Sequence, residues 1–436
     1  MKPSIATLFS HLTPSALSAL EDCNEQSLYA PGYVQNYGML LLLEEATLRI
    51  LQVSENVESW FGTPAESLLN QPLQRLFLPE QVQKITELLK QPSLEVHNPL
   101  ELETQSSVPS GRSAAQSFTG VFHRTGAGLL LELEPQSPGM VFSPLLVYQR
   151  LQATIANLRR ATSLSHLAQV LAREVKALTG FDRVMIYRFE ADEHGVVIVE
   201  EKESHLESFL GLHFPATDIP VPSRQLFYRN WVRQIPDVNA PPARLIAAVD
   251  TPPLDLSSCV LRGVSPYHIE YLQNMGVAGT LTLSLIDDQR LWGLIACHHS
   301  TPRFLDYSTR KTCEFLGQFA SIELVNQQER ELKGYRTQVK VIQDRLQQAF
   351  IKDFNFIEQV LTRNGNQLLK LVHAQGAAIV LGGQFRLVGQ TPSAAEVQDL
   401  VTWLMKHQTE HQSDGAAKPE RVFATSTLSQ VYPPAK

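Results

Sequence analysis

The sequence is poor in cysteine, and this scarcity limits the classes of protein that it can encode. Its 436 residues include four cysteines, which lie far apart, at positions 23, 259, 297 and 313. They are too few for a disulfide-stabilised scaffold, so we expect a protein of the reducing cytoplasm. The sequence also shows no zinc-binding spacing, no phosphate-binding loop and no dinucleotide-binding glycine motif.

Long apolar runs and an excess of positive charge are missing as well. The longest leucine run, at residues 40–43, falls far short of the ~18 apolar residues of a membrane-spanning helix. Acidic residues at positions 21, 22 and 25 argue against a signal peptide. The net charge of −7 disfavours a general surface for nucleic acid or anionic membranes, although it permits a local basic pocket. We therefore expect neither a nucleic-acid partner nor a membrane.

Composition and length suggest a globular protein of about three domains. Residues 1–32 form a polar arm that ends at the turn Pro31-Gly32. Residues 33–135 are predicted to be a first α+β domain, followed by a second domain over residues 145–328. The expected strands and helices of the first domain are 37–43, 48–53, 57–61, 64–69, 79–89, 121–123 and 129–133. Those of the second are two helices that end before Gly180, strands 183–189, 196–200, 277–286 and 291–298, and a long helix from Ser308 to Phe350.

Residues 329–362, which overlap the later part of this helix, are expected to form a connecting helix. Tyr335, Val339, Ile342 and Leu346 follow a heptad spacing, which fits either packing against the chain's own domains or a parallel dimer. Residues 363–436 begin a third module with a hairpin at 377–381 and 385–388. Roughly 70 residues leave little room for a well-buried core, so we expect this module to be incomplete.

Three motifs in the second domain bring together acidic, imidazole and aromatic side chains. They are Pro-Ala-Thr-Asp-Ile-Pro at 215–220, Ser-Pro-Tyr-His-Ile-Glu-Tyr-Leu-Gln-Asn-Met-Gly-Val at 265–277, and Leu-Trp-Gly-Leu-Ile-Ala-Cys-His-His at 291–299. With them, the chain resembles the photosensory region of a bacteriophytochrome. The resemblance implies an α+β chain: a PAS domain and a GAF domain, with antiparallel sheets flanked by helices, joined by a long helix to a partial, GAF-like PHY domain.

Cysteine placement indicates the subtype within this family. Plant-type and many cyanobacterial phytochromes attach the bilin at a GAF cysteine just before the histidine numbered His268 here, but that position is Tyr267. Bacteriophytochromes use a cysteine of the N-terminal arm, where this chain has Cys23. The resemblance therefore implies biliverdin, joined by a thioether at Cys23. Considered without the resemblance, Cys23 fits an unpaired, inert thiol. The sequence that follows Cys23 departs from the family motif, so the resemblance does not imply how complete the attachment is.

The resemblance also implies which residues would hold the polar groups of the bilin. Arg233 and Arg262 match positions that hold one propionate, and Thr280 and Thr282 match those that hold the other. Buried carboxylates need such hydrogen-bonded partners. The alternative is that the arginines make ordinary surface ion pairs.

Other matched positions surround the rings. Asp218, with Ile219 and Pro220 of its motif, lies beside the pyrrole nitrogens in the family, and His268 lies over the inner rings. His298 hydrogen-bonds the carbonyl of the terminal ring. Taken singly, the aspartate is a turn residue and each histidine an ordinary core or surface residue.

Four aromatic residues match the cage around the ring that rotates on photoisomerisation. They are Tyr187, Phe209, Phe214 and Tyr271, and each by itself also fits an ordinary aromatic core. The remaining cysteines, Cys259, Cys297 and Cys313, are expected to be buried in helices or strands.

The resemblance implies a red/far-red photoreceptor that signals by Z/E isomerisation and is not an enzyme. A homodimer through the helix from Ser308 to Phe350 and a downstream output partner are expected. Because the sequence ends before the family's tongue hairpin, we expect the red-absorbing state to form and the far-red product to be incomplete or short-lived. The alternatives are a light-insensitive PAS/GAF sensor of a small metabolite, and an enzyme using Cys23 or Cys259 with His268, for which no nucleophile–base motif is present.

Overall fold

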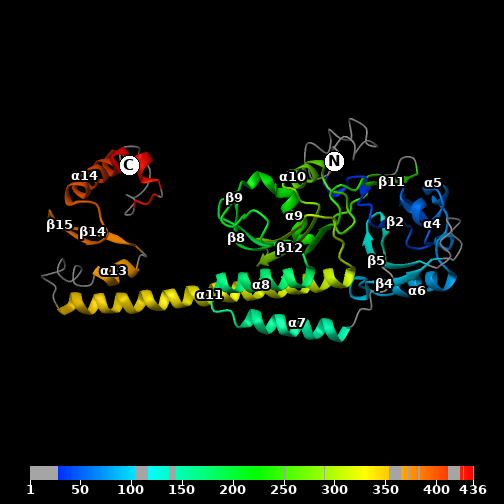
Figure 1. Cartoon of the computed structure of the whole chain (residues 1–436), viewed down its shortest axis with the longest axis horizontal. Coiled ribbons are helices and arrows are strands. Elements are labelled where there is room, and N and C mark those ends of the chain that lie inside the picture. The colour runs from blue at the N-terminus through cyan, green and yellow to red at the C-terminus, as the bar shows by residue number, and fades with distance from the viewer. Residues whose placement is uncertain are drawn as a thin grey trace. The chain divides into compact units, whose positions relative to one another are not determined.

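The structure is a computed structural model of the chain, and it divides into two compact units, residues 1–328 and 329–436 (Figure 1). Cys23 lies outside the described residues. The structure describes residues 28–104, 116–136, 144–248, 252–288, 290–352, 365–371, 374–381, 383–410, 423–425 and 427–435. None of the helices in these ranges is long and apolar enough to cross a membrane.

The first domain is an antiparallel sheet with short helices on one face. Its strands and helices are β2 (Met39–Leu43), β3 (Ile50–Ser54), α4 (Val57–Phe61), α5 (Ala65–Leu68), η1 (Leu73–Arg75), α6 (Pro79–Leu89), η2 (Glu95–His97), β4 (Leu100–Glu103), β5 (Ser117–Thr125) and β6 (Gly128–Pro135). The predicted strands and helices are confirmed, and β4 is an addition. Several ends differ by a few residues. Among them, β3 begins at Ile50 and not at Leu48, which takes a φ of 55° and stays in the turn.

Two strands from elsewhere in the sequence extend this sheet, and neither was predicted. They are β1 (Tyr33–Val34) and β11 (Ala243–Ala247), in the order β1-β11-β3-β2-β6-β5-β4. The amide of Leu245 donates to the carbonyl of Gly32 at 3.0 Å, and that of Gly263 donates to the carbonyl of Tyr33 at 3.1 Å. The segment after the N-terminal arm therefore lies between β11 and the segment around Gly263, both of which come from the sequence range of the second domain.

The second domain has a six-stranded antiparallel sheet in the order β10-β12-β13-β7-β8-β9. These strands are β7 (Arg183–Phe189), β8 (Gly195–Lys202), β9 (His213–Phe214), β10 (Val232–Ile235), β12 (Gly279–Asp287) and β13 (Arg290–His299). The helices are α7 (Pro144–Arg159), α8 (Leu164–Thr179), α9 (Val221–Arg229), α10 (Pro266–Asn274) and α11 (Tyr307–Lys352), with η3 at Ala216–Asp218. The predicted strands are confirmed with small shifts at their ends.

The two faces of this sheet have different coverings. Leu171 and Val175 of α8 and Leu324 of α11 pack with Ile186 and Leu283 of the sheet in one buried cluster. Helix α8 begins where the Ser163 hydroxyl accepts the amide of His166 at 3.1 Å, and it ends at Gly180 with φ 65°, as the sequence predicts. The other face lies toward η3, α9 and α10.

The second unit contains the later part of α11, then α13 (Gly365–Leu371), β14 (Gly376–Leu381), β15 (Gln384–Gly389), α14 (Ala394–Glu410), α15 (Leu428–Val431) and η5 (Pro433–Ala435). The β14–β15 hairpin is confirmed, and α14 was not predicted. Among the described residues of this unit, Val388 and Val397 are the hydrophobic residues that are buried. Three residues of the heptad spacing keep exposed surface: Tyr335 is 39% exposed, and Val339 and Ile342 are partly exposed.

Candidate functional site

The open face of the second sheet carries its polar side chains in rows that follow from strand register. Arg233 of β10 lies opposite Thr282 of β12, which lies opposite Ala296 of β13. In the neighbouring row, Thr280 lies opposite His298. Directly paired residues of antiparallel strands point to the same face, so these side chains form one surface.

A cavity of about 540 Å³ lies against this surface, within the size range of pockets for small-molecule ligands. Every predicted site residue within the described part of the chain lines it, except Phe209. The predicted residues that line it are Tyr187, Phe214, Asp218, Ile219, Pro220, Arg233, Arg262, His268, Tyr271, Thr280, Thr282 and His298. This placement leaves their individual roles as predictions.

The loop that carries Asp218 is held by one arginine. The Nε of Arg224 donates to the carbonyl of Ile219 at 2.7 Å and its NH2 donates to that of Ala216 at 3.1 Å, while NH1 lies 3.1 Å from the Glu193 carboxylate. The hydroxyl of Tyr271 donates to Asp218 Oδ2 at 3.4 Å. Arg224 thereby fixes the backbone on both sides of Asp218.

The two arginines of the cavity wall donate hydrogen bonds to backbone carbonyls. Arg233 donates to the carbonyls of Val260, Arg262 and Gly263 at 2.7–3.1 Å, and Arg262 NH1 donates to that of Leu28 at 2.8 Å. Burial lowers the pKa of both guanidinium groups, and the charge of Arg233 lowers that of Arg262 further. Arginine nevertheless stays protonated in proteins, so the wall is cationic, and a ligand carboxylate would relieve the repulsion between its charges.

The two histidines are held neutral by burial and neighbouring cations. Burial, then Arg233 and Arg262, lowers the pKa of His268 to about 4, although its side chain is accessible from the cavity that it lines. Burial, then Arg183 and His268, lowers the pKa of His298 to about 3. Both imidazoles therefore offer one donor and one acceptor at neutral pH.

The aromatic side chains divide into two groups. Tyr187 and Phe214 lie with ring centroids 5.9 Å apart on the cavity wall. Phe209 is absent from the lining, because the Glu200 carboxylate accepts its amide at 3.1 Å and its ring lies 3.7 Å from the Arg183 guanidinium carbon. It covers the buried Arg183–Glu200 ion pair instead of facing the cavity.

Comparison with known proteins identifies the family. Sequence models match in order: the PAS fold at residues 23–136, the GAF domain at 163–322 and the phytochrome region at 339–436. The phytochrome photosensory core module of Stigmatella aurantiaca is 38% identical, with a TM-score of 0.73, over 94% of this chain and 78% of that one. The chain belongs to the phytochrome family. This confirms the family resemblance and the PAS–GAF–PHY architecture.

Other phytochromes show similar agreement. The bacteriophytochrome RpBphP3 from R. palustris is 34% identical with a TM-score of 0.76, over 95% of this chain and 80% of that one. Cyanobacterial phytochrome B of Nostoc sp. is 39% identical over 96% of this chain and 54% of its own length. Cyanobacterial phytochrome A of the same organism is 40% identical over 94% and 52%. The chain thus spans about half the length of these curated relatives.

Several lining residues were not predicted. Ser265 stands at the N-cap position of α10 without a side-chain capping bond, and its buried Oγ has no partner among the described residues. Met185 and Leu28 also line the cavity. Strand alternation is the signal that was available for Met185, because it lies two residues before Tyr187 on β7. Leu28 had no such signal, because its place depends on the distant contact with Arg262.

The depressed pKa of His298 predicts acid-sensitive stability in the bilin-free chain. Between pH 6.5 and about 3, the unfolded state binds a proton that the folded state does not, so stability is lost as pH falls through this window. From pH 7 to pH 5 this amounts to at most about 2 kcal/mol. Urea unfolding of the wild type and of His298→Asn at both pH values measures it. In His298→Asn the free energy of unfolding should change less between pH 7 and pH 5 than in the wild type, whereas replacement of the exposed His97 should leave that change as it is. An equal change in all three proteins would contradict the prediction.

Proposed function

We propose that the chain is a light receptor that binds a bilin in the cavity of its GAF domain. One observation carries the proposal: Arg262, Ser265 and His298 line the cavity, and one polar atom of each (Nε, Oγ and Nδ1) is buried without a hydrogen-bond partner among the described residues. Buried polar groups are normally paired, so these three atoms indicate a polar ligand. Apolar and aromatic residues make up most of the remaining wall, which suits a flat conjugated molecule.

The donors match the chemistry of a ligand with two carboxylates. Arg262 and Arg233 would hold one propionate by charge-assisted hydrogen bonds. Thr280 and Thr282, which are separated by one residue and lie on the same face of β12, would donate hydroxyl hydrogen bonds to the other propionate. An anion bound here would also offset the free-energy cost of burying two neighbouring cations.

The remaining wall would orient the rings and exclude water. A bound bilin supplies visible absorption and a double bond that isomerises on excitation. His268 and His298, neutral in the cavity, would each donate or accept a hydrogen bond, with Asp218 held close by through the Arg224 clamp. Tyr187, Phe214 and Tyr271 would pack against the ring that moves, while Phe209 would act indirectly by covering Arg183.

We also propose that the bilin is biliverdin, attached through a thioether at Cys23. Leu28 lines the cavity and is anchored by Arg262 NH1. Cys23 precedes it by five residues, a distance along the chain that can span up to about 17 Å. The thiol is therefore within reach of a ligand in this cavity.

Signal output is proposed by analogy with the family. The heptad spacing on α11, in which Tyr335, Val339 and Ile342 keep exposed surface, supports a homodimer through this helix. A change in the cavity would pass along α11, because its first turns pack against the sheet that forms the cavity floor. A downstream output partner would read that change.

Absorption spectroscopy after co-expression with a biliverdin source tests the proposal. The wild type should show a red band that stays with the protein after acid denaturation, and Cys23→Ala should release it, whereas the control Cys313→Ser should retain it. Binding without linkage in the wild type would refute attachment at Cys23 and leave the cavity assignment intact. The absence of a band in every variant would refute the bilin and favour a metabolite sensor.

A further inference from the structure

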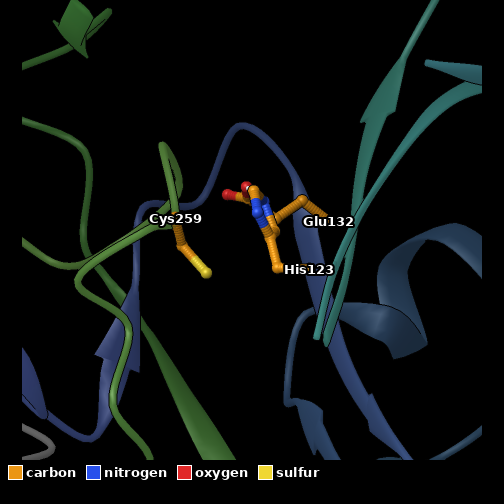
Figure 2. Close-up of side chains that lie close together, drawn as sticks. All are labelled: His123, Glu132 and Cys259. Carbon is orange, nitrogen blue, oxygen red and sulfur yellow. The ribbon is translucent and has the colours of Figure 1, made fainter. Parts of the chain in front are cut away.

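Three side chains with different metal-ligand chemistry meet on the first sheet, away from the cavity. His123 Nε2 lies 2.8 Å from Glu132 Oε1. One ligand atom from each of His123, Glu132 and Cys259 lies within 4.8 Å of the other two. Figure 2 shows the imidazole and carboxylate extending from neighbouring strands toward the loop that carries Cys259.

Strand register explains the meeting. Val121 of β5 lies opposite Glu132 of β6, so His123 is the diagonal neighbour of Glu132 on the same face. That face is covered by the loop before α10, where Leu254, Leu256 and Cys259 pack against the sheet. Cys259 was expected in a helix or strand; it is buried as predicted, but in this loop.

The surroundings favour a built site over a chance contact. Cys259 is fully buried and Glu132 is 2% exposed, while His123 keeps 18% of its side chain accessible. The second oxygen of Glu132 accepts the Leu261 amide at 2.7 Å. That bond fixes the direction of the carboxylate, as second-shell hydrogen bonds do for metal ligands.

We propose that His123, Glu132 and Cys259 bind a zinc ion between the PAS sheet and the loop before α10. One nitrogen, one oxygen and one sulfur ligand form a set that zinc accepts, with water in the fourth position. Zinc–ligand bonds of 2.0–2.3 Å hold ligand atoms about 3.5 Å apart, so the sulfur has to move by roughly 1 Å. The Cys259 thiol proton passes to solvent as the zinc–sulfur bond forms.

Neutral imidazole, carboxylate and thiolate would together neutralise the ion. This matters because an uncompensated charge at such a buried position is costly. Arg262 follows Cys259 by three residues, so the ion would also restrain the segment that supplies the cavity's cation. The site is independent of whether the cavity holds a bilin.

Zinc binding is testable on the untagged full chain produced without a bilin source. We expect one zinc per chain after equilibration with ZnCl₂ and removal of the excess. Cobalt substitution should give a near-ultraviolet thiolate-to-metal absorption band. Cys259→Ser and His123→Gln should each weaken zinc binding at least about tenfold, whereas Cys313→Ser, which changes another buried free thiol, should not.

Each outcome bears on the proposal. The cobalt band in the wild type requires no variant, so it remains decisive if a substitution impairs folding. Absence of that band, or zinc affinity equal in wild type, Cys259→Ser and His123→Gln, would overturn the site. The cluster would then be a cross-strand ion pair beside an unreactive thiol.

Discussion

Replacing Arg310 with methionine is expected to lower the free energy of unfolding of the PAS–GAF unit by about 3–5 kcal/mol. Arg310 lies on α11 and its NH2 lies 2.6 Å from Oε1 of Glu134 on β6, with both side chains 4% exposed. Its NH1 also donates to the carbonyl of Leu305 at 2.6 Å. The other Glu134 oxygen has no partner among the described residues. Loss of the guanidinium would therefore leave a carboxylate buried and unpaired.

The loss of unfolding free energy in Arg310→Met should grow as the pH rises. Burial raises the pKa of Glu134, and Arg310 is the largest influence that lowers it again. In Arg310→Met the folded state would therefore retain a proton to higher pH than the unfolded state, so stability falls as pH rises. The loss should be larger at pH 8 than at pH 5, where protonation relieves the buried charge.

Urea unfolding followed by tryptophan fluorescence measures these changes. Lys311→Met is the matched control, because the adjacent residue on α11 pairs with Glu314 while remaining 51% exposed, and exposed pairs contribute about 0–1 kcal/mol. The double variant Arg310→Met/Glu134→Leu should regain most of the loss, since it removes the charge with its partner. An Arg310→Met protein as stable as Lys311→Met, or a double variant as unstable as the single one, would contradict the argument.

Local patterns in the sequence predicted the regular elements well. Helix α6 was predicted with its observed bounds because Pro79 suits a first helical turn and Val82, Ile85 and Leu88 repeat on one face. β7 was likewise predicted over its full length. These elements depend on their own residues, so a single sequence suffices to find them.

Elements defined by distant partners were missed. β11 is short and follows two prolines, and it becomes a strand by pairing with β1 and β3, about 200 residues earlier in the chain; strand formation depends on such context. The position of Phe209 has the same cause, because its amide and ring are held by Glu200 and Arg183. The zinc candidate was also invisible, since sheet register brings His123 near Glu132 and packing of a distant loop brings Cys259 near both.

Arg262→Gln is expected to weaken bilin binding by about 30-fold to 1,000-fold, or about 2–4 kcal/mol. This prediction rests on the proposed function. The Nε of Arg262 is buried in the cavity wall without a partner among the described residues, so a propionate would give it one. The bilin-free protein should lose little stability, because the substitution removes one of two neighbouring buried cations while sacrificing the bond to Leu28.

Biliverdin and its dimethyl ester separate charge recognition from damage to the cavity. In a Cys23→Ala background, where binding is reversible, the wild-type arginine should favour the free acid, whereas Arg262→Gln should bind both ligands about equally. Arg188→Gln is the control, because Arg188 lies on the same sheet but pairs with Glu190 and is absent from the cavity lining. Equal loss of both ligands in Arg262→Gln would indicate distortion of the wall, and an unchanged preference for the free acid would assign the carboxylate to other residues. A preference that disappears only with Arg262 would establish it as the group that recognises the propionate.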